Sequence, residues 1–123
     1  MLSANSFAYG TNSKILLAPN AVASGTDSQA RGENSMAYGT NSETASGSTN
    51  ATTFGHSAYA NGVNTQAFGT SAKANGTNSQ ASGVNARAIG FNAVAQGTDA
   101  VAEGRNVIAI GTGARAFGYN TNV

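Results

Sequence analysis

GVNARAIGFNAVAQGTDAVAEG, at residues 83–104, consists of three seven-residue units in tandem followed by the glycine of a fourth. Each unit follows the pattern G-x-[N/D]-[A/S/T]-x-A-x, and most of the chain is an edited copy of it. The pattern glycine recurs every seven residues from Gly55 to Gly118 without a break. A short fixed period of this kind indicates a solenoid, in which each unit is buried only by stacking on its neighbours.

The seven-residue period does not predict a coiled coil. A coiled coil needs large apolar residues at positions a and d, whereas the recurring residues here are glycine and alanine. Within a unit the side chains alternate with a period of two, as in Ser6-Phe7-Ala8-Tyr9 before Gly10, which is typical of a β-strand. Because glycine and asparagine tolerate positive φ, the G-x-N element predicts a turn after each strand. Two units, or 14 residues, would then close one flattened coil with two short strands.

The repeat is irregular before Gly55. Leu17 stands where glycine is expected, and Ala18-Pro19-Asn20 adds one residue to the next unit. The steps from Gly39 to Gly47 and from Gly47 to Gly55 are each eight residues long, and we expect each to hold one extra residue in a turn. No linker is evident, so we expect residues 1–123 to form a single domain.

The alternation also predicts which side chains face the core. The residues two and four positions before each glycine are small, as in Ala86/Ala88 and Ala93/Ala95. The two sheets of the coil should therefore pack closer than the usual spacing of about 10 Å. Burying a methyl group contributes about 0.8 kcal/mol, whereas ordering one residue costs about 1.5 kcal/mol. We therefore expect an isolated chain to be unstable without further burial.

The outward positions, one and three before each glycine, differ between alternate strands. One set carries no charge, and we name its large side chains the uncharged face: Phe7, Tyr9, Met36, Tyr38, Phe54, Phe68, Val94, Ile108 and Ile110. The other set holds five of the six basic residues, and we name the following members the basic face: Lys14, Arg31, Tyr59, Lys73, Arg87 and Arg115. An exposed apolar stripe marks a protein interface, so the uncharged face is predicted to contact sister chains. The basic face is either a solvated surface that prevents aggregation or a contact surface for a receptor.

Three units resemble a known family. NVIAIG at residues 106–111, NARAIG at 85–90 and NSMAYG at 34–39 are similar to the N-S-x-A-I-G phrase of YadA-type heads, the heads of trimeric autotransporter adhesins. The resemblance extends over essentially the whole chain. It implies an all-β fold, a left-handed parallel β-roll with 14 residues per coil, and a homotrimer around a threefold axis. The uncharged face is then the expected trimer interface, and the handedness comes from the family alone.

The same resemblance implies a non-enzymatic attachment module, displayed outside the cell, that binds a host or matrix surface. Full-length family members also have a signal peptide, a neck, a stalk and a membrane anchor, which we do not find in these 123 residues. Two origins therefore stay open: a head taken from a bacterial surface adhesin, or a bacteriophage virion protein, such as a tail fibre, that uses the same roll.

Two other function classes also stay open. Threonine follows glycine at positions 11, 26, 40, 70, 77, 98 and 112, as in an ice-binding solenoid, although Glu33, His56, Val63, Val84, Phe91 and Arg105 interrupt the series. A purely structural role in a fibre or capsid is the other class. In a fibre or capsid, the open edges of the parallel strands would favour end-to-end stacking of such segments.

Composition argues against catalysis and against several kinds of ligand. With six basic and five acidic residues, the net charge is +1, too weak a field to attract nucleic acid or an anionic membrane. The chain has no cysteine, and His56 is its only histidine, so we expect no catalytic site, no metal and no cofactor. The Asn/Asp positions of the turns predict a ladder of side-chain amides, with sugar binding as a lesser alternative.

Overall fold

The structure, a computed structural model, describes residues 6–15, 20–45 and 47–121, which form sixteen strands in two parallel eight-stranded sheets. Sheet 1 contains β1 (Phe7–Tyr9), β3 (Val22–Ser24), β5 (Met36–Tyr38), β7 (Thr52–Phe54), β9 (Gln66–Phe68), β11 (Gln80–Ser82), β13 (Val94–Gln96) and β15 (Ile108–Ile110). Sheet 2 contains β2 (Lys14–Ile15), β4 (Gln29–Ala30), β6 (Glu43–Thr44), β8 (Tyr59–Asn61), β10 (Lys73–Asn75), β12 (Arg87–Ile89), β14 (Val101–Arg105) and β16 (Arg115–Tyr119). No described segment is a helix long and apolar enough to cross a membrane.

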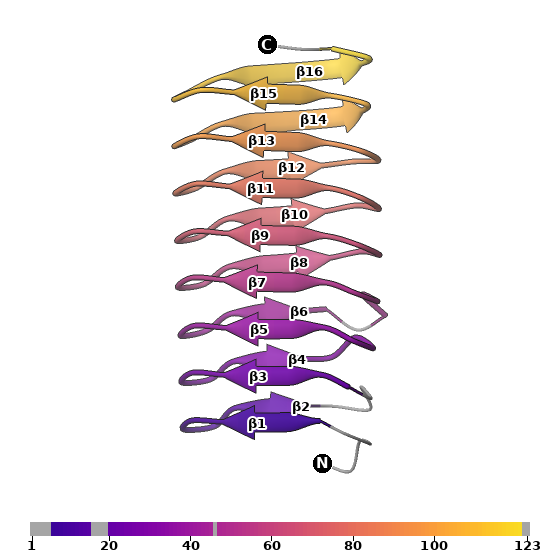
Figure 1. Cartoon of the computed structure of the whole chain (residues 1–123). Coiled ribbons are helices and arrows are strands. Elements are labelled where there is room, and N and C mark those ends of the chain that lie inside the picture. The colour runs from indigo at the N-terminus through magenta and orange to yellow at the C-terminus, as the bar shows by residue number, and fades with distance from the viewer. Residues whose placement is uncertain (1–5, 16–19, 46, 122–123) are drawn as a thin grey trace.

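The chain alternates between the two sheets at every turn, so consecutive strands belong to opposite walls of one roll (Figure 1). In the regular part of the chain, strand partners lie one 14-residue coil apart, for example Lys73 beside Arg87 and Gln80 beside Val94. The odd strands run leftward across the front of Figure 1 and the even strands return behind them as the chain rises, which makes the roll left-handed. The parallel β-roll predicted from the period and from the family resemblance is therefore confirmed.

The core between the sheets is built mainly of alanine, with buried serine and threonine at some of the inward positions. The inward residues predicted from the alternation, including Ala86, Ala88, Ala93 and Ala95, have no solvent exposure. The larger fully buried side chains, Val107 and the threonines 44, 53 and 65, are few. Because alanine presents a single methyl group, each coil buries little apolar surface of its own.

The turns have the backbone geometry that the G-x-N pattern predicts. Asn85 and Asn92 have φ angles of 60° and 58°, in the left-handed region. The amide of Asn85 donates to the carbonyl of Thr70 in the coil below at 2.9 Å, so the turns, like the strands, are hydrogen-bonded from coil to coil. The same geometry occurs at Ser57 and Ser71, which shows that the backbone position is fixed even where asparagine is absent.

The expectation of one extra residue in each of two turns is wrong. The coil that pairs Met36 with Thr52 is two residues longer than the regular coil, and both extra residues lie between Thr44 and Ser48. Ser48, and not Gly47, takes the glycine place in the turn: a Cβ on Gly32 would meet the backbone of Ser48, whereas one on Gly47 would meet nothing within 4 Å. A pattern aligned on glycines could not show this.

Counting from Gly47 also misplaces one strand. The outward residue of β6 is Glu43, and Thr44 is fully buried, whereas the spacing from Gly47 predicts Thr44 on the outside. A shift of one residue along a strand moves every side chain to the other face. The single extra residue near Pro19 is confirmed by the 15-residue offset between Ile15 and Ala30, although residues 16–19 themselves lie outside the described part.

Candidate interaction surfaces

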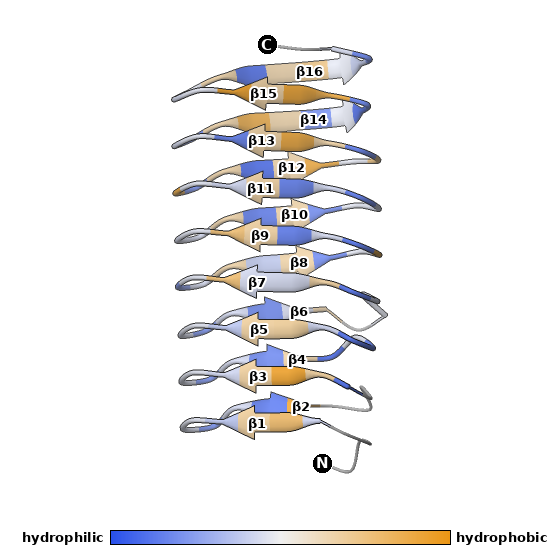
Figure 2. Cartoon of the chain, viewed as in Figure 1, coloured by the Kyte–Doolittle hydropathy of each residue, from blue (hydrophilic) through white to orange (hydrophobic). Residues whose placement is uncertain are grey.

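The uncharged face lies on the outer side of sheet 1, along the full height of the roll. All its members occupy outward positions of sheet 1 strands, which carry no charged residue at any described position. Phe7 and Tyr9 are 59% and 67% exposed, and Ile110 is 58% exposed. The face is most apolar toward its two ends, and Gln66 and Gln80 make its centre polar but uncharged (Figure 2).

Three aromatic rings stack along the middle of this face. The ring centroids of Tyr38 and Phe54 are 4.8 Å apart, and those of Phe54 and Phe68 are 5.0 Å apart, with the rings nearly parallel. The parallel register produces this stack because it places the same position of successive coils side by side. The three side chains stay partly exposed, so the stack presents a continuous aromatic strip to a neighbouring molecule.

The basic face lies on the outer side of sheet 2. Lys14, Tyr59, Lys73, Arg87 and Arg115 occupy the first position of their strands and so form one column along the roll. The Nζ of Lys73 lies 5.9 Å from the ring centroid of Tyr59. Sheet 1 and sheet 2 thus differ in outward charge as the sequence predicts.

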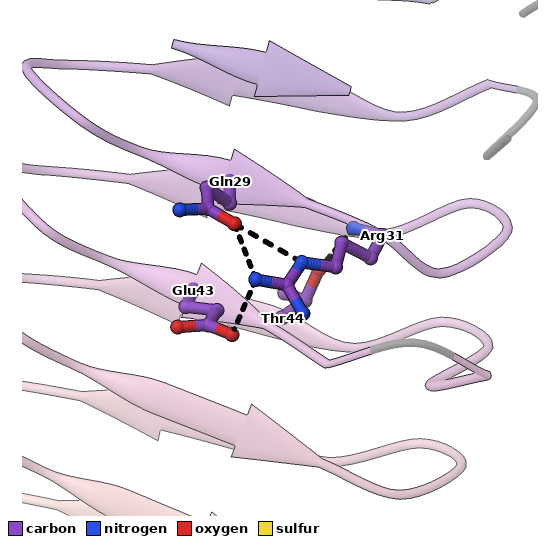
Figure 3. Close-up of polar contacts among 4 residues, drawn as sticks. All are labelled: Gln29, Arg31, Glu43 and Thr44. Carbon is purple, nitrogen blue, oxygen red and sulfur yellow. Dashed lines mark hydrogen bonds and ion pairs between the residues drawn. The ribbon is translucent and has the colours of Figure 1, made fainter. Parts of the chain in front are cut away.

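Arg31 differs from the other basic side chains of this face because, among the described residues, it alone forms an ion pair. Its guanidinium pairs with Glu43 at 3.1 Å, and its Nε donates to the side-chain oxygen of Gln29 at 3.0 Å (Figure 3). Its backbone N–H donates to the hydroxyl of Thr44 at 3.1 Å, which fixes the local backbone as well. Arg31 and Glu43 neutralise each other, so this region adds little positive charge to the basic face.

The pattern of outward positions does not identify several exposed residues near the C-terminal coils. Phe91, Arg105 and Tyr119 follow pattern glycines and read as turn residues in the sequence. In the structure β14 and β16 continue through their glycines, and Arg105 lies beside Tyr119 as a strand partner. The signal available in the sequence is the size of these side chains, since threonine is the common residue after glycine.

The Asn/Asp positions of the turns form the predicted ladder. Side-chain amides donate from coil to coil between Asn92 and Asn106 and between Asn106 and Asn120, both at 3.0 Å. Every described turn that follows a sheet 2 strand has asparagine at this position, including Asn20 and Asn50, which the repeat pattern omits. Where these amides bond to one another, they satisfy part of each other's hydrogen-bonding capacity.

The described residues contain no cluster of three or more His, Asp or Glu side chains that could hold a metal ion. His56 is exposed in the turn after β7, and its Nδ1 lies 3.2 Å from the hydroxyl of the adjacent Ser57. The two groups lie next to each other in one exposed turn.

Comparison with known proteins agrees with this description. The family model for the YadA head domain repeat (2 copies) matches residues 18–42, 60–86, 81–106, 88–114 and 103–121. No curated protein sequence matches the chain. Among solved structures, the collagen-binding domain of the Yersinia adhesin YadA superposes with a TM-score of 0.73 at 26% identity, covering 89% of this chain.

The chain spans 66% of the length of that collagen-binding domain. The family matches extend over 18–42 and 60–121, which is more than half of the 123 residues. The matched ranges cover tandem copies of the repeat, and the superposed fold is the roll described above. On these grounds the chain belongs to the YadA head domain repeat family.

Proposed function

We propose that the chain is a non-enzymatic attachment module, an adhesin head that works as a homotrimer and binds a matrix or host surface. The observation that carries the proposal is the segregation of charge between the two outer faces of a roll whose core is alanine. Sheet 1 carries exposed aromatic rings without any charge, which suits burial against sister chains. Sheet 2 carries the basic side chains, which suits a surface that stays in water.

The trimer part of the proposal is tested by size. We expect the wild-type protein to elute as a trimer in multi-angle light scattering. Replacing Phe54 and Phe68 together by glutamate should give monomers or unfolded chains, because three sister chains would bring like charges together in an apolar interface. The matched control, Lys73→Glu with Arg87→Glu, alters sheet 2 and should leave the trimer intact. A folded wild-type monomer in dilute buffer would exclude this part of the proposal.

The ligand part rests on the relative whose title names it as collagen-binding. We propose a collagen-type matrix protein as the first ligand to test, by biolayer interferometry on immobilised triple-helical collagen. Three identical faces should bind about a hundredfold more tightly than one through avidity, so the monomeric variant should bind weakly. If the wild-type trimer forms but does not bind collagen, the ligand assignment fails while the assembly stands.

We place the module on an exposed fibre, at a cell surface or on a virion. A second candidate, an ice-binding solenoid, is favoured by one observation. In the turns after sheet 1 strands, the residue after glycine is an exposed threonine at positions 11, 26, 40, 70, 98 and 112, with interruptions only at His56 and Val84. A thermal hysteresis measurement separates the two functions, since an adhesin should leave ice growth unchanged.

A further inference from the structure

A second cluster of apolar side chains, most of them exposed, lies on sheet 2, on the opposite wall from the uncharged face. We name it the aromatic–arginine patch: Ile89, Phe91, Arg105, Arg115, Phe117 and Tyr119. These residues come from β12, the turn after it, β14 and β16, which are stacked toward the C-terminal end of the roll (Figure 1). Glu103 lies between Ile89 and Phe117 in the parallel register, and Arg105 lies beside Tyr119, so the cluster spans three adjacent strands.

The aromatic members of the patch are largely open to solvent. Phe91 is 41% exposed, Phe117 is 51% exposed and Tyr119 is 64% exposed. Contiguous exposed apolar surface marks an interaction site. Tyrosine and arginine are also the residue types that dominate the centres of protein–protein interfaces. The composition of the patch therefore fits a protein partner.

The two arginines are held in place by the rings. The guanidinium of Arg105 lies 5.1 Å from the ring centroid of Phe91, and that of Arg115 lies 5.2 Å from the ring centroid of Phe117. Stacking occupies the flat face of a guanidinium and leaves its in-plane N–H donors available for a carboxylate. Within the described residues neither arginine forms an ion pair, in contrast to Arg31, which is paired with Glu43.

The net charge of the patch and its surroundings indicates the chemistry of the partner. Arg105 and Arg115 belong to the patch, and Glu103 lies between two of its members in the strand register. Arg87 is on the same strand as Ile89, at the edge of the patch. Three positive charges and one negative charge leave this area at +2, although the whole chain carries only +1. Such a surface attracts acidic groups, and its apolar rings require apolar side chains next to those groups.

We propose that the aromatic–arginine patch is the docking surface for an acidic, extended segment of a partner protein. Carboxylates of the segment pair with Arg105 and Arg115, and its apolar side chains cover the rings of Phe91 and Phe117. The inference deepens the proposed function and rests on it in one respect: sister chains cover sheet 1, so sheet 2 is the outward wall. Light scattering of the wild-type protein tests that premise separately.

The experiment uses the whole chain and a defined probe. A fluorescein-labelled peptide of repeated Glu-Leu-Pro units, which proline keeps extended, is titrated with protein and followed by anisotropy. A peptide with glutamine in place of glutamate is the matched probe. We expect the acidic peptide to bind at least about tenfold more tightly, and added salt to weaken it.

The matched variants locate the binding. Arg105→Gln with Arg115→Gln should weaken the acidic peptide by about tenfold or more. Lys14→Gln with Lys73→Gln removes the same charge from sheet 2 outside the patch and should change affinity by less than about twofold. Circular dichroism melting confirms that both variants fold. If the arginine variant does not fold, amide chemical shifts of the wild-type protein serve instead, and we expect the acidic peptide to move those of β14 and β16.

The proposal would be overturned by equal binding of the glutamine peptide, by undiminished binding of the acidic peptide to the arginine variant, by shift changes confined to other strands, or by binding of heparin but not of the acidic peptide. The heparin result would identify the patch as a sulfated-polysaccharide site. Loss of the native oligomer in the arginine variant would also overturn it, because the patch would then be a subunit contact. None of these results alters the test of the uncharged face.

Discussion

At Gly83 two separate constraints act on one residue. Its φ is 126°, a conformation that side-chain-bearing residues rarely adopt, and a Cβ built there would lie 2.6 Å from the carbonyl oxygen of Gly97 in the next coil. The obstructing atoms are backbone and cannot move aside without separating two coils. Gly113 provides the contrast, since it has a φ of 70° and a Cβ there would meet nothing within 4 Å.

These two glycines should therefore respond in opposite directions. Gly83→Ala should lower the free energy of unfolding by more than about 3 kcal/mol, because strain and overlap add. Gly113→Asn should raise it by about 0.5 to 1 kcal/mol, because asparagine already adopts this φ in the other turns and restricts the unfolded chain. Urea unfolding followed by circular dichroism measures both. Equal losses for the two variants would show that close packing of the glycine column is not the cause.

Strand β7 contains a buried polar group that has no hydrogen-bond partner within the described part of the chain. Thr53 takes an inward position that alanine holds in the neighbouring strands, and its buried hydroxyl has no hydrogen-bond partner. Thr65, the residue before β9, is equally buried, but its hydroxyl donates to the carbonyl of Gly62 at 3.1 Å. An unpaired buried hydroxyl costs about 1 to 3 kcal/mol.

Thr53→Val should therefore raise the urea midpoint, with a gain of about 1 to 3 kcal/mol in unfolding free energy. The same substitution at Thr65 removes a made hydrogen bond and should lower stability by about 1 kcal/mol. The two variants change the same atoms in the same kind of core, so each is the control of the other. A loss at both positions would mean that volume, and not hydrogen bonding, decides the outcome.

The strands also show which side-chain positions the sequence predicts correctly and which it does not. Alternation with a period of two places the alanines inside and the aromatic side chains of sheet 1 outside, because the pleat leaves no other choice. The prediction fails at Thr44, because the glycine pattern places Gly47 in the turn, whereas Ser48 occupies that place. Arg105 escapes the pattern for a related reason: a residue after glycine reads as a turn, although β14 continues through Gly104. Phe91 does lie in a turn, after the end of β12, and only the size of its side chain distinguishes it. The local alternation of residues predicts which side chains of a strand share a face. Only the pairing between stacked coils determines which of the two faces lies in the core.

Over the whole molecule, the two sheets end in strands that pair with a single strand among the described residues, β1 and β15 in sheet 1 and β2 and β16 in sheet 2. The outer edge of β15 is partly covered, because Ile108 N–H donates to the carbonyl of Thr121 at 2.8 Å. Phe7 N–H and Tyr9 C=O bond toward β3, so the polar backbone groups of Ala8 point to the open edge. An open edge is a template for further strands. We therefore expect the 123-residue protein to associate end to end at high concentration.

Ala8→Pro removes an edge donor without removing a bond to β3, so it should reduce this association. Ala8→Ser keeps the N–H and serves as the control. Negative-stain micrographs and light scattering over a concentration series measure the outcome. Uniform particles that never lengthen, in both the wild-type protein and the serine variant, would contradict the expectation.

Each strand inside the roll pairs only with the strands one coil above and one coil below it. Duplicating or losing a block of fourteen codons would therefore lengthen or shorten the molecule by about 4.8 Å while leaving its cross-section unaltered. Recombination between near-identical repeats can therefore change the length of the molecule in steps of one coil. The distance to which the outermost surface projects can change in this way during evolution, while every contact within the roll stays the same.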